Sequence, residues 1–137
     1  MDISIWLVLA ATVVQFIIGA MWYSPLMFGK WWMQIMEMSH VSKAELQAME
    51  KSMIPFYGLQ FVLTLFSTLA LANGMAYFVG LSIYNVVIWL WLGFLVPTTI
   101  SSIIWGRTQK KYWLQQTGIM LSMQIVCLMV AAYILTI

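Results

Sequence analysis

Four long runs of apolar residues, separated by polar connections, make up most of this chain. The runs cover about residues 3–22, 54–72, 82–105 and 114–137, and none contains Asp, Glu, Lys, Arg or His. A helix needs about 20 mainly apolar residues to cross the roughly 30 Å of hydrocarbon in a bilayer. Apolar and polar residues do not alternate in these runs, as they would in the strands of a membrane barrel. The pattern predicts an all-α integral membrane protein with four transmembrane helices.

Composition leads to the same conclusion and excludes several other classes of protein. Of the 137 residues, 64% are hydrophobic and only 7% are charged, whereas about a quarter of a soluble domain is charged. Disordered and collagen-like chains are excluded for the same reason. The single cysteine, Cys127, permits no intrachain disulfide. We therefore expect residues 1–137 to form one transmembrane domain.

Lysine and arginine residues lie in only two of the three connections between the runs. The connection that begins with the turn signal Asn73–Gly74 has none, and the other two share Lys30, Lys43, Lys51, Arg107, Lys110 and Lys111. Short connections rich in Lys and Arg remain on the cytoplasmic side of a membrane. The first and third connections are therefore expected in the cytoplasm, with both termini on the opposite side.

The first connection, residues 23–53, has the pattern of two short helices. Ser24 followed by Pro25 predicts a helix start, with the helix running to about Met38. Its aromatic rings and one lysine suit the headgroup level, so we expect an interfacial amphipathic helix between the first and second spans. Ser42 begins the capping-box sequence SKAE, which predicts a second helix that runs to about Ser52.

The third connection places its basic residues between aromatic ones. Arg107, Lys110 and Lys111 lie between Trp105 and the pair Tyr112–Trp113. This composition is typical of the belt that fixes helix depth, and it also suits contact with anionic lipid.

Polar side chains inside the spans fall at a similar depth. At about 1.5 Å per residue, Gln15, Gln60, Thr98 and Gln124 lie roughly 9–15 Å below the cytoplasmic end of their helices. Tyr57, Gln60, Thr64 and Ser67 share one helical face, which we expect to point inward. Pro97 frees a backbone carbonyl, and the hydroxyls of Thr98, Thr99, Ser101 and Ser102 could satisfy it or line a wet cleft. Two interpretations remain open: the amides hydrogen-bond across helices and fix the bundle, or they line a pocket for a neutral ligand.

The spans lack the side chains that several kinds of chemistry require. Ion-coupled transport and acid–base catalysis within the membrane need ionisable side chains, which the spans lack, so we expect no enzyme and no catalytic residues. The soft donors Met33, Met36 and His40 lie in the string MQIMEMSH, which is only a weak candidate for a Cu(I) site. No cofactor, metal or nucleic-acid partner is expected.

The segment AMWYSPLMFGKWWMQ, together with GFLVP and the closing stretch GIMLSMQIVCLMVAAYILTI, resembles the small bacterial membrane proteins of the domain of unknown function 1761 family. The resemblance covers essentially the whole chain. It implies four spans, a bacterial inner-membrane location and no assigned activity. The resemblance marks two sets of residues, first Trp22, Tyr23, Ser24, Pro25, Phe28, Gly29, Lys30 and Trp32, and second Gly93, Phe94 and Pro97.

Two functional hypotheses follow. The first is that a neutral or lipid-like molecule binds at, or passes through, the polar layer. The second is that the protein has a structural or accessory role, in which the aromatic interfacial helix docks a membrane protein partner or organises lipid. Small residues such as Ala70 and Gly74 favour close helix contacts, so a homo-oligomer is expected in either case.

Overall fold

The computed structural model describes residues 3–38, 40–106 and 108–137. Every regular element within these residues is helical, as predicted. In chain order they are α1 (Ile5–Trp22), α2 (Gly29–Ile35), α3 (Lys43–Ser52), α4 (Ile54–Tyr77), α5 (Ile83–Leu90), the π-helical turn η1 (Trp91–Leu95), α6 (Val96–Ile104), the 3₁₀ turn η2 (Lys110–Tyr112) and α7 (Trp113–Thr136). Arg107 lies outside the described residues.

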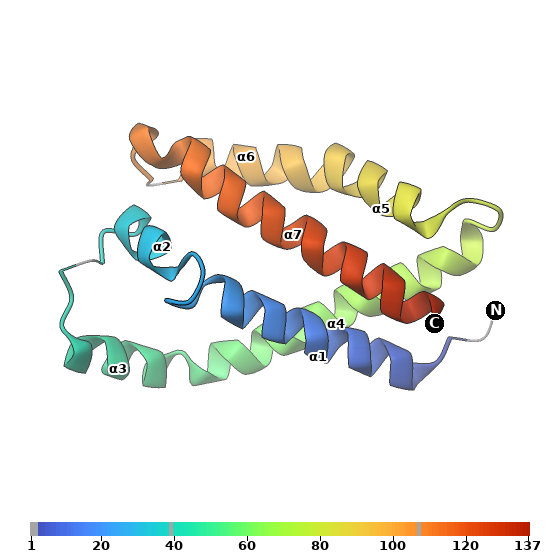
Figure 1. Ribbon diagram of the computed structural model, residues 1–137, viewed down its shortest axis with the longest axis horizontal. Coiled ribbons are helices and arrows are strands. Elements are labelled where there is room, and N and C mark those ends of the chain that lie inside the picture. The colour runs from blue at the N-terminus through green and yellow to red at the C-terminus, as the bar shows by residue number, and fades with distance from the viewer. Residues whose placement is uncertain (1–2, 39, 107) are drawn as a thin grey trace.

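Four helical segments are long and apolar enough to cross a bilayer: Ile5–Trp22, Ile54–Tyr77, Ile83–Ile104 and Lys110–Thr136. Figure 1 shows both chain ends at the same end of the bundle, opposite α2 and α3. The four predicted spans are confirmed as helices of sufficient length and apolar character.

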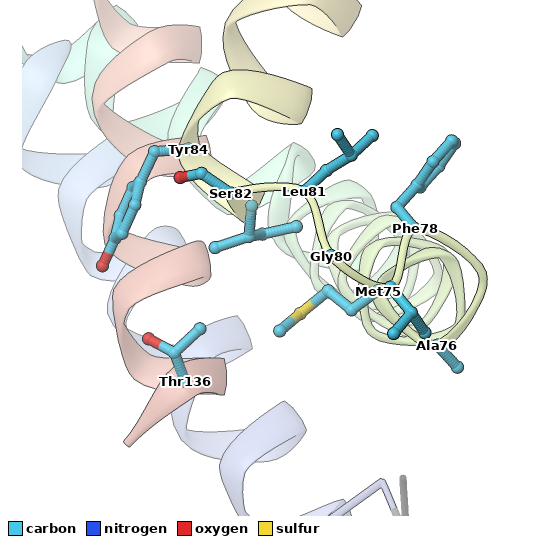
Figure 2. Close-up of a pocket in the computed structure, with 10 residues that line it drawn as sticks. Met75, Ala76, Phe78, Gly80, Leu81, Ser82, Tyr84 and Thr136 are labelled. Carbon is cyan, nitrogen blue, oxygen red and sulfur yellow. The ribbon is translucent and has the colours of Figure 1, made fainter.

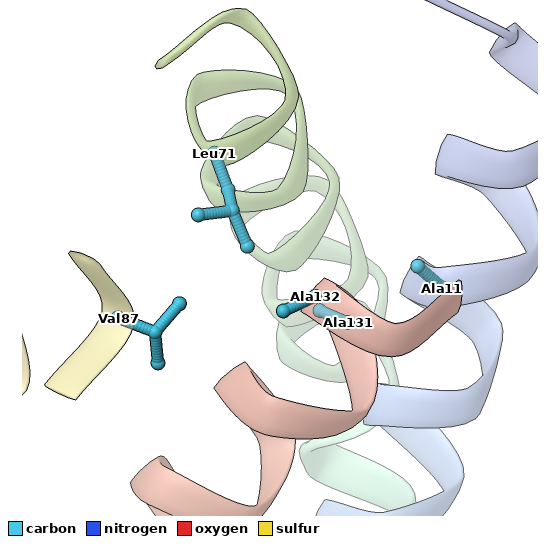
Figure 3. Packing of buried hydrophobic residues seen from close by; sticks show 5 residues of the cluster. All are labelled: Ala11, Leu71, Val87, Ala131 and Ala132. Atoms are coloured by element: carbon cyan, nitrogen blue, oxygen red, sulfur yellow. The ribbon is translucent and has the colours of Figure 1, made fainter. Parts of the chain in front are cut away.

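The central helix of the bundle is α7. Figure 1 shows it running between the α5–α6 segment on one side and the pair α1 and α4 on the other. It contacts α1, α5, η1 and α6, whereas α4 packs chiefly against α1. Near the end of the bundle that holds the chain termini, Ala11, Leu71, Val87, Ala131 and Ala132 form the buried core (Figure 3). The three alanines allow the helix backbones to approach closely.

The turn predicted at Asn73–Gly74 is wrong, because α4 continues through it to Tyr77. The side-chain amide of Asn73 donates to the carbonyl oxygen of Leu69 at 2.8 Å, so this polar residue is satisfied within the helix. The chain reverses after Phe78, where Gly80 adopts a φ of +89° that favours glycine. Ser82 then occupies the N-cap position of α5, without a side-chain cap bond.

The first connection folds differently at its two ends. The predicted helix start at Ser24–Pro25 is wrong, because the Ser24 hydroxyl donates back to the Met21 carbonyl at 2.6 Å and α2 begins only at Gly29. The second predicted helix is confirmed as α3. The backbone N–H of Glu45 donates to the Ser42 hydroxyl at 3.3 Å, which is half of the expected capping box.

The third long helix contains a wide π-helical turn directly before its proline. Pro97 has no N–H to donate to the carbonyl four residues earlier, and the N–H of Val96 bonds instead to the Trp91 carbonyl five residues back. The hydroxyls of Thr98 and Ser102 donate to carbonyls of their own helix, those of Phe94 and Thr99. The hydroxyls of Thr98 and Ser102 are thus used within their own helix.

Candidate functional site

The first polar contact between helices joins α1 to α4. Gln15 is only 9% exposed, and its Nε2 donates to the Thr68 hydroxyl at 2.8 Å and to the Ala11 carbonyl at 3.1 Å. Thr68 in turn donates to the Thr64 carbonyl at 2.8 Å. This chain of hydrogen bonds links the two helices without using any charged group.

The second polar contact joins α7 to α6. The Nε2 of Gln124 donates to the Thr99 hydroxyl at 3.0 Å. The thiol of Cys127, one helical turn further along α7, approaches the Gln15 carbonyl oxygen at 3.8 Å. Gln124 and Gln15 therefore lie within roughly 5 Å of the same level along the bundle. Two cross-helix pairs thus flank α7 at one depth.

Two buried amide oxygens have no donor within the part of the chain that the structure describes. They are the Oε1 atoms of Gln116 and Gln124, both on α7. Gln116 is 7% exposed, and its Nε2 makes only a long contact of 3.9 Å with the sulfur of Met120. An unpaired buried oxygen costs free energy, so these two atoms give α7 buried acceptors that lack a donor among the described residues.

The other residues predicted in the polar layer do not join these pairs. Gln60, Pro97 and Thr98 are exposed, and Thr64 is half-buried. The expectation that Gln60 faces inward is wrong, because the buried residues of α4, Thr68, Leu71 and Ala72, all lie in its second half, and Gln60 lies in the first half, where no residue is buried. The structure therefore pairs two of the predicted residues, Gln15 and Gln124, with the hydroxyls of Thr68 and Thr99, of which only Thr99 was among the hydroxyls expected beside Pro97.

The hydroxyl that the sequence did not identify belongs to Thr68. It lies one residue after Ser67, which was expected to face inward and is exposed. One residue turns the side chain by about 100° around a helix, which is enough to exchange an inward position for an outward one. The helical spacing of Thr68 with Leu71 and Ala72 was the available signal.

Gln60, Thr64 and Ser67 instead form an outward strip, which we call the polar face of α4. The Nε2 of Gln60 donates to the Thr64 hydroxyl at 3.3 Å, and that hydroxyl donates to the Gln60 backbone carbonyl at 2.9 Å. Ser67 is exposed one turn further along. Within the described residues, no hydrogen bond reaches Oε1 of Gln60. A glutamine on an otherwise apolar surface is thus left with unused donor and acceptor capacity.

The pocket shown in Figure 2 lies away from all of these polar groups. Its volume is about 420 Å³, and it is formed where the turn between α4 and α5 meets the end of α7. Leu81, Tyr84 and Thr136 are among the residues that line it. Because Gln15 and Gln124 contribute nothing to this pocket, it does not provide the amide-lined cavity that the sequence suggested.

At the opposite end, aromatic rings close the bundle. We call this group of residues, Trp22, Tyr23, Phe28, Trp31 and Trp32, the aromatic cap. The ring centroids of Trp22 and Phe28 are 5.2 Å apart, those of Phe28 and Trp31 are 5.5 Å apart, and those of Tyr23 and Trp32 are 4.7 Å apart. Burial raises the pKa of the Tyr23 phenol. The cap is therefore held together largely by contacts among its own rings.

Two tryptophans attach their segments to α7. The indole Nε1 of Trp22 donates to the Ile119 carbonyl at 3.1 Å, and that of Trp91 donates to the Leu121 carbonyl at 3.2 Å. The first bond ties the aromatic cap to α7, and the second ties the π-helical turn to it. Both bonds satisfy an indole that is partly buried.

The lysines of the third connection lie at this same end of the bundle. The Nζ of Lys111 lies 5.0 Å from the ring centroid of Tyr112, and that of Lys110 lies 6.0 Å from the ring centroid of Trp113. Lys30 is exposed on α2. The expected anionic-lipid contact of Arg107 falls outside the described residues. The placement of Lys110 and Lys111 gives this end of the bundle a positive rim.

The weak copper candidates lie around the end of α2. Met33 is half-buried, and Met36 and His40 are exposed. Within the described residues, His, Cys, Asp and Glu side chains form no group of three or more that could hold a metal ion. We propose no metal site on these residues.

Comparison with known families covers almost the whole chain. A family model described as "Protein of unknown function (DUF1761)" matches residues 6–136. The chain belongs to this family. No curated protein and no solved structure matches it.

Within this DUF1761 chain, the motif W-Y-S-P-x-x-F-G-K has a structural explanation. The backbone N–H of Gly29 donates to the Ser24 carbonyl at 2.9 Å, and that of Phe28 donates to the Trp22 carbonyl at 3.0 Å. A Cβ on Gly29 would lie 2.5 Å from the carbonyl carbon of Ser24, so only glycine fits. The motif residues build a tight turn that folds the aromatic cap onto the end of α1.

Proposed function

We propose that this protein is a structural or accessory protein of the bacterial cytoplasmic membrane that associates laterally with a membrane protein partner through the polar face of α4. The observation that supports this proposal most directly is the outward position of Gln60 on an apolar helix. Polar groups without hydrogen bonds cost several kcal/mol each in hydrocarbon, where no water can replace the missing partner.

Gln60 keeps more unused hydrogen-bonding capacity than several hydroxyls on the outer surfaces of the long helices. The hydroxyls of Thr64, Thr98 and Ser102 donate to carbonyls of their own helices. Gln60 uses one N–H on Thr64 and keeps a second N–H and Oε1. A partner that supplies the missing groups would remove this cost.

The exposure of α4 supports the same proposal. Only 6% of its most apolar 18-residue window is buried, against 17–22% in the other three segments. Its outward side combines large apolar side chains with the polar face. Lipid tails can pack against the apolar side chains, but they cannot form hydrogen bonds with the polar face. Helix association in membranes relies on close packing and interhelical hydrogen bonds, which this face offers.

The proposed orientation places α2, α3 and η2 in the cytoplasm and both termini outside. The supporting observation is that the lysines of the connections lie at one end of the bundle. They are on α2 (Lys30), α3 (Lys43 and Lys51) and η2 (Lys110 and Lys111). The α4–α5 turn, at the other end, contains no Lys or Arg. The aromatic cap would then lie at the inner headgroup level and organise lipid there. A membrane-impermeant maleimide should label Leu81→Cys in spheroplasts and Lys43→Cys only after lysis, and the reverse pattern would exclude this orientation.

Site-specific photo-cross-linking in intact cells tests the lateral association. A photoreactive amino acid at Ser67 should form a protein adduct, because Ser67 lies on the polar face. The matched control is Val62, which is 46% exposed and lies about 200° around the helix from Gln60. If Ser67 gives no more protein adduct than Val62, the proposal fails.

A second candidate function rests on the unpaired Oε1 atoms of Gln116 and Gln124. These acceptors on α7 suit the hydroxyl or amide N–H of a neutral or lipid-like molecule that binds between the helices. Native mass spectrometry of the purified protein tests this candidate. A stoichiometric extra mass that is lost in Gln124→Leu would support it, and a ligand-free spectrum would count against it.

A further inference from the structure

We infer that the partner of the polar face of α4 is a second copy of this chain, in a symmetric dimer in which the two Gln60 amides hydrogen-bond to each other across a two-fold axis. This inference rests on the proposed function, because it specifies which partner α4 docks.

The chemistry of Gln60 favours a copy of itself. A primary amide carries both donor and acceptor, so two amides related by a two-fold axis form a reciprocal pair of hydrogen bonds. Each Gln60 has the required groups, because only one N–H is used on Thr64 at 3.3 Å. The helix Ile54–Tyr77 carries no charged side chain. Two copies of this helix therefore do not repel each other electrostatically, and an oppositely charged partner would gain nothing by binding to it.

The spacing along α4 suits a close pairing of two like helices. Gln60, Ser67 and Gly74 recur every seven residues, with the exposed residues Leu63 and Ala70 between them. A seven-residue repeat with alternating steps of four and three follows the seam of two helices that cross in a left-handed sense. The same row of positions serves both helices in a two-fold dimer, because such an interface uses one surface patch twice.

Side-chain size along this row falls from the α3 end of the helix to the end near the chain termini. Gln60 is followed by Ser67 and then by Gly74, where a Cβ would meet nothing nearer than the Phe78 ring at 4.0 Å. Ala70, between Ser67 and Gly74, is also small and is exposed. The open space at Gly74 allows a second backbone to approach most closely there, as small residues do at helix contacts in membranes.

Disulfide cross-linking of the purified full-length protein in liposomes of phosphatidylethanolamine and phosphatidylglycerol tests the inference. In a Cys127→Ala background, Ser67→Cys should give a band at twice the mass of the chain on oxidation. The matched control Val62→Cys should give severalfold less. Adding Gln60→Leu to Ser67→Cys should weaken dimerisation by roughly tenfold, because two interhelical hydrogen bonds are lost.

A second variant guards against a folding defect at Ser67. Gly74→Cys lies on the same row, has room for its side chain and should give the same dimer band. Equal cross-linking of Ser67→Cys and Val62→Cys would overturn the inference, since it would indicate random collision. No dimer from purified protein, combined with a photo-adduct to a different protein at Ser67 in cells, would overturn the dimer and leave the proposed function standing. No adduct in either experiment would overturn both.

Discussion

Gly29 occupies a position at which any side chain collides with the backbone. Its added Cβ would lie 2.5 Å from the Ser24 carbonyl carbon and 2.7 Å from the Tyr23 carbonyl oxygen. Neither neighbour is a flexible side chain, so the turn itself must shift to make room. At the residue scale, this glycine is what allows the aromatic cap to fold back onto α1.

Replacing Gly29 therefore tests the role of this turn. Gly29→Ala should destabilise the protein by about 1–3 kcal/mol, the usual cost of overpacking a tight site. Thermal unfolding in mild detergent, followed by tryptophan fluorescence, measures the change. Gly58→Ala is the matched control, because a Cβ there meets nothing within 4 Å. Equal stability of the two variants would show that the Gly29 contact carries no strain.

The contact between α1 and α4 is the clearest interaction at the scale of elements. Its polar component is the hydrogen bond from Gln15 to Thr68, at 2.8 Å. Hydrogen bonds between helices in a membrane contribute on the order of 1 kcal/mol, because the separated helices find other partners. The remaining stabilisation comes from packing of small and apolar residues.

A double-mutant cycle isolates this bond. Gln15→Leu and Thr68→Val should each destabilise the bundle, and their coupling energy should be about 0.6–1.7 kcal/mol. Unfolding of the purified protein in mixed detergent micelles gives the four free energies. A coupling energy near zero would mean that the pair fixes geometry without adding stability.

The sequence was sufficient to predict the elements but not how they face one another. Uncharged apolar runs identify four helices because the bilayer imposes that requirement on length and composition. Their ends were less predictable where a side chain had a local partner, as Asn73 has in Leu69 and Ser24 has in Met21. The polar residues of one helix can bond inward, outward or to their own backbone, and the sequence does not distinguish these outcomes.

Gln15 and Gln60 illustrate this limit. Both stand in uncharged apolar helices, yet Gln15 is buried against Thr68 and Gln60 is exposed. In a soluble protein the apolar side of a helix would indicate its packing face, whereas a membrane helix is apolar on every side. The inward face of α4 is therefore visible only in the three-dimensional contacts of Thr68, Leu71 and Ala72.

At the scale of the whole molecule, the fold places its polar groups in two distinct settings. Gln15 hydrogen-bonds from α1 to α4, and Gln124 hydrogen-bonds from α7 to α6. Gln60 faces outward on α4, the helix that the rest of the chain covers least. The first setting explains how the chain holds together, and the second is the basis for proposing that it assembles with a copy of itself.

Native mass spectrometry of the protein, released from a mild detergent, tests this central claim most directly. The wild-type chain should appear as a dimer, Gln60→Leu should appear mainly as a monomer, and the matched variant Val62→Leu should remain dimeric. A monomeric wild type, or a Gln60→Leu variant as dimeric as the wild type, would contradict the assignment of α4 as the interface.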